Sequence, residues 1–494
     1  MPFFRLIFFS IQTFHILLII TLDNFFADGV MLLVSGLLNL FLYSYYLIKH
    51  YSRRDFIDPI SLYLVSSIIR LGIGTIYSGL VVINGYEEIL EIGYFSSLSD
   101  AFIEGHTIFM IGDLVFIYGY YLFSSHYTSA SRLEKNLNYS HIYKVGLFLS
   151  LFIILLRFIL IGASSEQEFG RFFHYIVRFG PPAFLYLMLN SMMKQNINLF
   201  LSLKGLTCLI IFMAMFYVAI RSYMKSDLLL VLMPYIIISL QNYRKIFLKS
   251  GLFVKVIKAI PIIFISYFLI VTLTVYSEIR RLEIATNYEL TESIEVTPFL
   301  VEAVGASVPG TEKFYQYNKF PDSGAWHFVK RLTVTNLGAW SFKEVSEYGH
   351  WDRNFFEDIA SSVIPRVLWP EKPNFWPGRI FAAKVGHAYD AESATTATAL
   401  GMAASYYWWG GLPVLIIGMF LSGCILSMVF RIIQPSISSN PISTIIWLIL
   451  LNTSLFWFES SFYGGAQMFI YLTVAFLPIM FLYQTLFIKN RIQY

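Results

Sequence analysis

Charge is the scarcest feature of this 494-residue chain. Only 13% of its residues are Asp, Glu, Lys or Arg, whereas 57% are hydrophobic and the mean hydropathy is +0.63. A soluble domain carries about 25% charged residues, so this chain lacks the polar surface that an aqueous protein needs. The composition predicts an all-α polytopic membrane protein.

Cysteine is almost absent as well. The two cysteines, Cys208 and Cys424, both fall inside apolar runs, which argues against a disulfide framework. The N-terminal apolar run is not followed by a small-residue cleavage motif. We therefore expect residues 3–22 to form an uncleaved first span and not a signal peptide.

Several signature motifs are missing. The sequence has no HExxH or CxxC zinc spacing, no Walker loop, no GxGxxG after a strand and no GxSxG, so zinc, nucleotide and serine-esterase chemistry have no support. We expect no metal, no cofactor and no nucleic-acid partner. One alternative stays open: Asp23 and Asp28 resemble the acidic pair of metal-dependent lipid-linked glycosyltransferases, although the orientation of the first hairpin also accounts for them.

Apolar runs of membrane-spanning length are what the chain has in abundance. A helix needs about 20 apolar residues to cross a hydrocarbon core of about 30 Å. The sequence predicts twelve such spans: 3–22, 29–48, 59–83, 101–124, 142–163, 173–193, 198–219, 227–240, 256–277, 410–430, 442–457 and 466–488.

The connections between these spans alternate in charge, and Lys and Arg are enriched in short cytoplasmic loops. The connections predicted as cytoplasmic carry the basic residues Lys49, Arg53, Arg54, Arg132, Lys135, Lys194, Arg244, Lys245, Lys249, Arg431, Lys489 and Arg491. The opposite connections carry Asp23, Asp28, Glu87, Glu88, Glu91, Glu166, Glu168 and Glu459. Both termini are therefore predicted to be cytoplasmic.

A long polar loop, about 278–409, divides the chain into spans 1–9 (1–277), the loop itself and spans 10–12 (410–494). The loop holds 12 Lys and Arg against 16 Asp and Glu, a net charge of −4, so the remainder of the chain carries +8. It also holds seven of the nine tryptophans and three of the nine histidines. We expect the chemistry to take place in this external loop.

The loop combines predicted short helices with a rigid turn. Apolar residues at mixed helical spacing predict two or more helices within 325–368 that lie on the membrane domain. Four prolines within 364–378 forbid a continuous helix there. The resulting turn presents Arg366, Lys372, Trp369 and Trp376.

Two interpretations of the loop tryptophans stay open. Tryptophan is at home in the interfacial belt of a membrane protein. Alternatively, Trp351, Trp369 and Trp376 provide flat surfaces for sugar rings.

Several titratable residues of the loop are candidates for a general base. His350 and Asp352 place an imidazole near a carboxylate, and Glu357 and His387 are further candidates. A solvated surface histidine is the simpler interpretation of His350. His327 completes the three loop histidines, which have no zinc-site spacing.

Arginines at the predicted outer ends of spans are exceptions to the orientation rule. Arg178 and Arg221 either reach lipid headgroups or pair with nearby acids, or they form a cationic site for an anionic ligand. The planar guanidinium suits phosphate because it donates paired, charge-assisted hydrogen bonds.

Motifs in one order along the chain carry a family resemblance. They are Arg178-Phe179 with Pro182-Ala183, Arg221 in Ala-Ile-Arg-Ser, Arg331, the turn from Ile364-Pro365 through Leu368-Trp369-Pro370 to Pro373, and the stretch from Thr395 to Gly411. On these residues the chain resembles the Wzy-type oligosaccharide repeat-unit polymerases, particularly relatives of the enterobacterial common antigen polymerase. It departs from them at Arg221, whose context lacks their glycine.

The resemblance implies a GT-C-like, metal-independent glycosyltransferase in the bacterial cytoplasmic (inner) membrane. Such an enzyme transfers a growing glycan from undecaprenyl diphosphate to a lipid-linked repeat unit, in the synthesis of O-antigen of lipopolysaccharide, capsule or exopolysaccharide. The implied diphosphate-binding residues are Arg178, Arg221, Arg331 and Arg366, with Arg221 and Arg331 also catalytic. Membrane lipids are expected partners, and binding of a chain-length regulator stays open.

Three alternatives remain. An O-antigen-type ligase would attach finished glycan to its acceptor, and a flippase would transport the lipid-linked sugar. A non-catalytic scaffold would tolerate alanine at the arginines.

Overall fold

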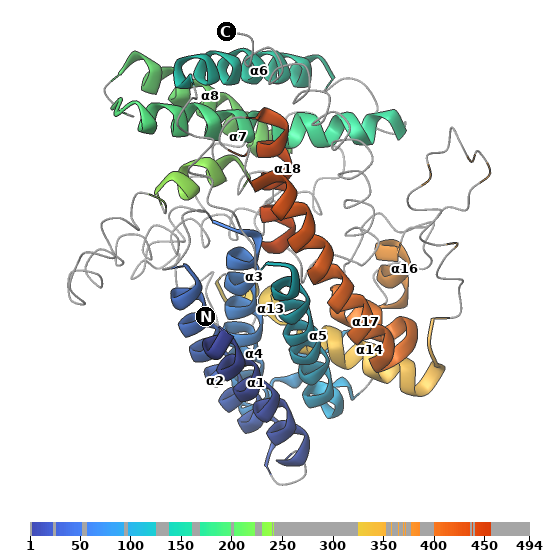
Figure 1. Cartoon of the computed structure of the whole chain (residues 1–494). Coiled ribbons are helices and arrows are strands. Elements are labelled where there is room, and N and C mark those ends of the chain that lie inside the picture. The colour runs from blue at the N-terminus through green and yellow to red at the C-terminus, as the bar shows by residue number, and fades with distance from the viewer. Residues whose placement is uncertain are drawn as a thin grey trace, which may run out of the picture. The chain divides into compact units, whose positions relative to one another are not determined.

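The computed structural model describes a set of ranges separated by gaps. They are residues 2–22, 26–51, 57–92, 97–124, 138–160, 168–198, 202–222, 230–239, 241, 325–351, 357, 364, 369, 371, 377–385, 400–434, 437 and 440–455. The regular structure within these ranges is helical and contains no strand (Figure 1). The predicted all-α class is therefore confirmed for the described part of the chain.

Five described helical segments are long and apolar enough to cross a membrane. They are Arg5–Leu22, Asp28–His50, Pro59–Ile83, Leu98–Phe123 and Met402–Ile433. Each coincides with a predicted span, which supports a membrane protein. Four shorter apolar helices, Tyr139–Leu155, Leu203–Ala219, Leu230–Ser239 and Pro441–Leu455, fall on further predicted spans. The spans predicted at 256–277 and 466–488 lie outside the described residues, so the count of twelve stays a prediction.

The chain divides into two compact units that interleave along the sequence. The first comprises 1–52, 67–111 and 244–348, and the second comprises 53–66, 112–243 and 349–494. The long loop is thus shared, with its helices up to residue 348 in the first unit and its later part in the second.

Close helix packing builds the first unit. Helix α2 (Asp28–Tyr51) runs against α4 (Thr75–Ile83), and glycines let the two backbones approach. A Cβ atom on Gly79 would lie 2.6 Å from the Leu33 nitrogen, and one on Gly36 would lie 2.7 Å from the Ile76 nitrogen. Helix α1 (Pro2–Leu22) lies beside α2, and the ring of Phe8 stacks on Tyr46 at 4.3 Å.

The third span changes its helical geometry part-way. Helix α3 (Pro59–Ser67) passes into a π-helix, η1 (Ile68–Gly74), and then into α4. A π-helix frees backbone groups from the ordinary pattern and is frequent at functional sites. The Leu71 carbonyl within it accepts a hydrogen bond from Asn39 Nδ2 at 3.3 Å, which ties the π-helix to α2.

A buried polar cluster joins the helices of this unit. The His106 ring, in α5 (Phe102–Phe123), makes hydrogen bonds at both nitrogens, to Ser35 Oγ at 2.7 Å and to Thr75 Oγ1 at 3.3 Å. Gln12 Nε2 donates to Asn39 Oδ1 at 2.9 Å. Such bonds fix the relative positions of helices that lipid does not otherwise drive together.

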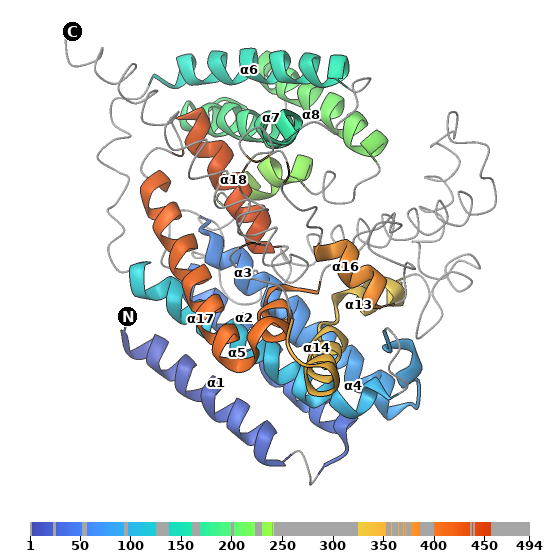
Figure 2. The ribbon, with the colours of Figure 1, turned by 90° about the vertical axis from the view of Figure 1, so that its right-hand side faces the viewer.

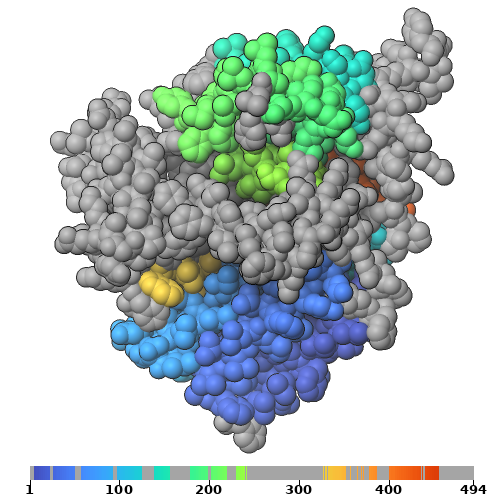
Figure 3. Space-filling view, turned by 90° about the vertical axis from the view of Figure 1, so that its left-hand side faces the viewer, coloured from blue at the N-terminus to red at the C-terminus, as the bar shows by residue number. Residues whose placement is uncertain are grey.

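Two helices of the long loop pack onto the first unit. They are α13 (Ala325–Leu332) and α14 (Thr335–Tyr348), so the predicted short helices are confirmed for 325–348. Helix α13 lies beside α4 (Figure 2), and Figure 3 shows yellow loop atoms against the blue atoms of the N-terminal helices. Short η2 (Glu87–Ile89) and η3 (Leu98–Ala101) flank the connection between α4 and α5.

The second unit holds the remaining helices. Helices α6 (Tyr139–Leu160), α7 (Glu168–Lys194) and α8 (Leu203–Ser222) lie together (Figure 1). Helix α18 (Pro441–Leu455) packs on α7, where Trp447 meets Tyr186 edge-on at 4.9 Å. The second half of α5 meets α17 (Met402–Ile433) at Gly423, where a Cβ atom would collide with the Phe116 carbonyl.

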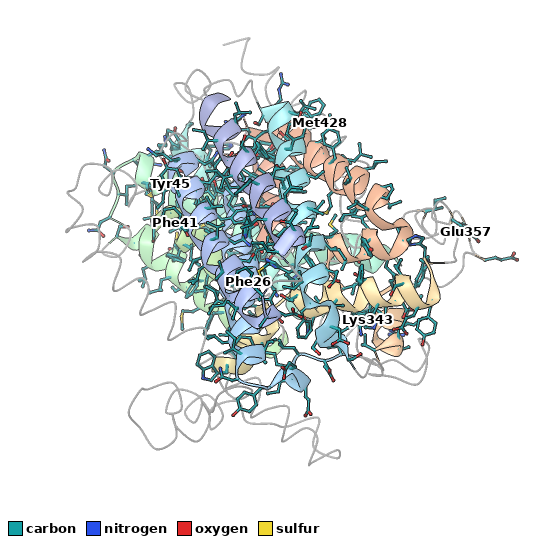
Figure 4. The ribbon with its side chains drawn as sticks, turned by 90° about the horizontal axis from the view of Figure 1, so that it is seen from below. Phe26, Phe41, Tyr45, Lys343, Glu357 and Met428 are labelled. Carbon is teal, nitrogen blue, oxygen red and sulfur yellow. The ribbon has the colours of Figure 1, made fainter. Side chains whose placement is uncertain are left out.

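Large apolar side chains cover outward faces of these helices. Phe41 and Tyr45 of α2 stack on each other at 6.5 Å with their rings nearly parallel, and 68% of Phe41 is exposed (Figure 4). Exposed leucines, isoleucines and phenylalanines continue along α1, α8 and α17. In water such surfaces would be an aggregation hazard, whereas they suit contact with lipid.

Candidate functional site

The first candidate group lies on the hairpin formed by α13 and α14, which we call the loop hairpin (residues 325–348). Arg331 is the penultimate residue of α13. The next residue, Leu332, contacts η1 so closely that a Cβ atom on Gly74 would lie 2.7 Å from the Leu332 carbonyl oxygen. Trp326 stacks on Tyr77 of α4 with ring centroids 6.0 Å apart. The backbone at Arg331 is therefore held against the membrane helices.

The second helix of the hairpin is held against α5. A Cβ atom on Gly338 would collide with the Gly105 carbonyl, and one on Gly105 would collide with the Ala339 nitrogen. Farther along α14, Lys343 Nζ donates to Ser97 Oγ at 3.0 Å and to the Ser97 carbonyl, and it pairs with Asp100 at 3.7 Å (Figure 4). The loop hairpin is thus fixed at its tip and in the second half of α14.

A second candidate group lies in the second unit, at the beginning of α17. The backbone N–H of Trp351 donates a hydrogen bond to the backbone carbonyl of Trp408 at 3.0 Å, and the two indoles meet edge-to-face with ring centroids 4.3 Å apart. Trp408 is 7% exposed and Trp351 is half-buried. Trp351 therefore offers part of its surface to a ligand while Trp408 supports it from behind.

The same corner contains a broken helix. Helical structure begins at Met402, earlier than the predicted span at 410–430, and it is interrupted at Gly410 and Gly411. Gly411 has φ 67° and ψ −156°, a conformation open essentially to glycine. A Cβ atom there would lie 3.1 Å from His350 Cε1, so the exposed His350 ring lies at the break beside Trp351.

Two of the predicted diphosphate-binding arginines, Arg178 and Arg221, lie in the second unit, on α7 and α8. Arg178 is half-buried within α7, and its guanidinium carbon lies 5.6 Å from the centre of the Phe179 ring. Helix α7 begins at Glu168, before the predicted span 173–193, and continues through Pro181 and Pro182. Arg221 is the penultimate residue of α8, which the predicted topology places at the outer face.

Of the remaining predicted site residues, the structure describes Glu357 and Trp369. Glu357 is exposed and projects away from the helices (Figure 4), while Trp369 is half-buried. Asp352, Arg366, Trp376 and His387 lie outside the described residues. Within the described ranges, no group of three or more His, Cys, Asp or Glu is arranged to hold a metal ion.

Three features of these sites were missed from sequence. Trp408 was counted among the loop tryptophans but not recognised as the support for Trp351. Gly105 and Gly338 allow the closest helix crossing of the loop hairpin. The only signals for them were single glycines in otherwise ordinary helical segments, which do not indicate their partners. The break in α17 was missed as well, although Gly410, Gly411 and Pro413 are a local signal for one.

A comparison of the chain with protein-family models, with curated proteins and with solved structures finds no match. The assignment of a function therefore depends on the residues and their arrangement.

The pair of Trp351 and Trp408, which we call the tryptophan corner, gives a prediction that distinguishes a supporting indole from one that contacts a ligand. Trp408→Ala removes a buried indole and should lower the free energy of unfolding by about 3–5 kcal/mol. Trp351→Ala removes a half-buried ring and should cost less stability. If Trp351 supports a sugar ring, as one interpretation of the sequence has it, this variant should also weaken glycan binding. Chemical unfolding in detergent micelles and binding of a soluble repeat-unit oligosaccharide measure the two effects. An equal loss of stability in both variants would contradict this division of roles, and Trp351→Phe is the control that keeps an aromatic ring.

Proposed function

We propose that this protein is a Wzy-type polysaccharide polymerase. It transfers a growing glycan from undecaprenyl diphosphate to a lipid-linked repeat unit at the outer face of the bacterial cytoplasmic membrane. The proposal includes twelve spans, cytoplasmic termini and a GT-C-like architecture. The product is O-antigen, capsule or another exopolysaccharide.

The observation that carries the proposal is the seating of the loop hairpin on the membrane helices. Arg331 lies in helix α13 and not in an irregular loop, and its backbone is held beside η1 and α4. A lipid-linked diphosphate is confined to the membrane surface, so its cationic site must be attached to the membrane domain. The tryptophan corner, with His350 beside it, supplies the surface that a sugar ring would need.

The chemistry follows from the substrate. The acceptor hydroxyl attacks the anomeric carbon of the donor, a new glycosidic C–O bond forms, and the bond from that carbon to the diphosphate oxygen breaks. The diphosphate leaves with the bonding electron pair, and arginines stabilise its charge. Groups aimed at developing charge are often the largest catalytic contribution. The hydroxyl proton passes to a base, for which His350, Asp352, Glu357 and His387 are candidates, a role typically worth about 10²–10⁴-fold.

Deletion of the gene tests this function directly. We expect a host without the gene to keep single repeat units and to lose the long ladder when surface and lipid-linked glycans are separated on a gel. If long chains persist on the lipid carrier but are no longer attached to the final acceptor, the protein is a ligase and not a polymerase. Long surface chains in the deletion strain would contradict both.

A second candidate function is a flippase or transporter of the lipid-linked sugar. It is favoured by the polar residues buried within the spans of the first unit, among them Gln12, His15, Asn39 and His106. Ionisable residues inside a membrane often mark a transport pathway, and transporters use broken helices such as α17. Loss of single repeat units from the outer face in the deletion strain would favour this function.

A further inference from the structure

The loop hairpin contacts two spans well inside their outer ends. Gly74, which meets Leu332, lies nine residues before the end of the span Pro59–Ile83. Gly105, which meets Gly338, lies seven residues after the start of the span Leu98–Phe123. At roughly 1.5 Å per residue, these contacts are about 13 Å and about 10 Å along the helices from their outer ends.

The other end of the hairpin returns to the outer end of the same spans. Lys343 bonds to Ser97 and pairs with Asp100, and these two residues lie at the start of η3. After Lys343 the chain becomes exposed, at Ser346 and Glu347 among others. Helix α14 therefore rises along α5 from inside the span to its outer end, and the connection 333–334 is the deepest part of the loop hairpin.

The tip, residues 330–336, is built to lie away from water. Leu332, Thr333, Val334 and Thr335 are all buried. The Thr333 nitrogen and hydroxyl both donate to the Lys330 carbonyl, at 3.1 and 2.8 Å. Irregular backbone at membrane depth is tolerated only where protein or a water-filled cavity surrounds it, and this tip meets the first condition.

The membrane helices provide a close-fitting surface for this tip, which we call its seat and which is formed around Gly74 and Gly105. The two glycines that admit it, Gly74 and Gly105, are followed by Thr75 and His106, which hydrogen-bond to each other at 3.3 Å. That bond holds the start of α4 and α5 at one separation directly behind the tip. The seat is thus part of the buried polar cluster and is not a chance contact of a surface loop.

One polar group of the tip has no partner. The Thr335 hydroxyl is completely buried and makes no hydrogen bond within the described part of the chain. A buried hydroxyl without a partner costs about 1–3 kcal/mol, a cost that a hydrogen bond to a ligand would remove. Thr335 is also the first residue of the 14-residue helix α14, whose amino-terminal end carries partial positive charge and favours anions.

We propose that residues 325–348 form a re-entrant hairpin whose tip binds the diphosphate of a polyprenyl-linked substrate below the outer surface of the membrane. The identity of the ligand rests on the proposed function. Lys330 and Arg331 bring two positive charges to the last turn of α13, and Thr335 supplies a hydroxyl at the start of α14. A polyprenyl diphosphate can reach such a site with its tail still in lipid, so only the glycan has to project into the aqueous phase.

Binding of undecaprenyl diphosphate to the full-length protein in lipid nanodiscs tests the site. Thr335→Val keeps the side-chain shape and removes the unpartnered hydroxyl, so we expect weaker binding by about 10-fold or more with unchanged or higher thermal stability. Replacement of a residue with a purely structural role would lower ligand binding and thermal stability together. The matched control is Ser346→Ala, an exposed serine near the other end of α14, which should bind as wild type does. Unchanged affinity in Thr335→Val, or no binding by the wild-type protein, would overturn the site.

The depth of the hairpin is tested separately. Cys208 and Cys424 are both buried and are replaced by alanine, after which a single cysteine at the half-buried Leu337 or at the exposed Glu347 carries a fluorescent label. Lipids brominated on their acyl chains should quench the label at residue 337, and aqueous iodide should quench the label at residue 347. Iodide quenching at both positions would show that the hairpin is not re-entrant.

The two proposals fail in different ways. Loss of the polymer ladder on gene deletion with unchanged binding by Thr335→Val would keep the polymerase and remove the tip as its diphosphate site. Weaker binding by Thr335→Val with a normal ladder in the deletion strain would keep the site and remove the polymerase.

Discussion

Replacing Gly338 with leucine should abolish long polymer while the protein still inserts into the membrane. Gly338 and Gly105 meet backbone to backbone, and even a Cβ atom on Gly338 would collide with the Gly105 carbonyl. Backbone cannot move aside as the end of a flexible side chain can, so α14 must leave its position on α5. Displacing the loop hairpin by about 1 Å is enough to lower a rate by about 10²-fold where positioning matters.

Alanine at the same position gives the graded version of this experiment. Gly338→Ala adds only the Cβ atom, so its loss of polymer should be smaller than that of leucine but still large. Polymer length on gels and the amount of inserted protein are measured together. Glu347, exposed on α14, offers a cysteine-labelling position to follow any displacement of the hairpin.

The matched control is Gly146→Ala in α6. A Cβ atom there would lie 2.9 Å from Met188 Cγ, on an unbranched side chain that can adjust, and 3.2 Å from the Phe184 carbonyl oxygen, a much milder backbone contact than the collision at Gly338. Alanine is also favoured over glycine within a helix by about 1 kcal/mol. We expect near-normal polymer from Gly146→Ala. Equal losses in the α6 and α14 variants would mean that the loop hairpin has no special role.

Alanine at Arg221 or Arg331 should lower the polymerisation rate by about 10²-fold or more, by analogy with the removal of a group that stabilises a charged transition state. Arg178→Ala should have a smaller effect, because Arg178 lies within α7 and is partly occupied by the Phe179 ring. The effect is measured as the initial rate of polymerisation with purified protein and lipid-linked repeat units, outside the living cell.

Lysine at the same positions separates two explanations for these arginines. A basic residue in the last turn of α8 stabilises the helix by about 0.3–1 kcal/mol through its dipole, and lysine does this as well as arginine. Paired hydrogen bonds to phosphate need the planar guanidinium. If Arg221 binds the diphosphate, Arg221→Lys should be intermediate in rate. If Arg221 only stabilises the end of α8, Arg221→Lys should match the wild-type protein.

The control for charge is Arg431→Ala. Arg431 is exposed in the last turn of α17, on the side that the charge pattern predicts as cytoplasmic. It should leave the rate unchanged, although it lowers the net charge of the protein as much as the other variants do. A loss of activity in Arg431→Ala equal to that in Arg221→Ala would point to an effect on insertion.

The location of the helices was largely readable from the sequence. The predicted span 59–83 coincides with the three consecutive helical segments that end at Ile83, and the predicted span 101–124 lies within one residue of the end of α5. Long apolar runs are a strong signal because every residue of a span contributes to the same free energy of transfer into lipid. Apolar residues at mixed helical spacing within 325–368 likewise predicted short loop helices on the membrane domain, and α13 and α14 occupy the first part of that range.

The partners of individual residues were not readable in this way. Gly105 and Gly338 are separated by more than 200 positions, and nothing local to either glycine predicts that the two backbones meet. The same holds for Trp351 and Trp408, and for His106 with Ser35 and Thr75. The π-helix η1 is another example, since its residues read as an uninterrupted apolar helix.

Composition and the pattern of apolar runs are enough to predict an all-α protein with membrane-spanning segments, a charged and tryptophan-rich loop, and arginines at the predicted outer ends of its spans. Packing between distant segments alone turns the loop back into the first unit, leaves the Thr335 hydroxyl without a hydrogen-bond partner among the described residues, and brings His350 to the break in α17. Hydrophobic transfer is additive along the chain and can be read residue by residue. Contacts between distant segments depend on shape, and shape exists only once the helices have packed.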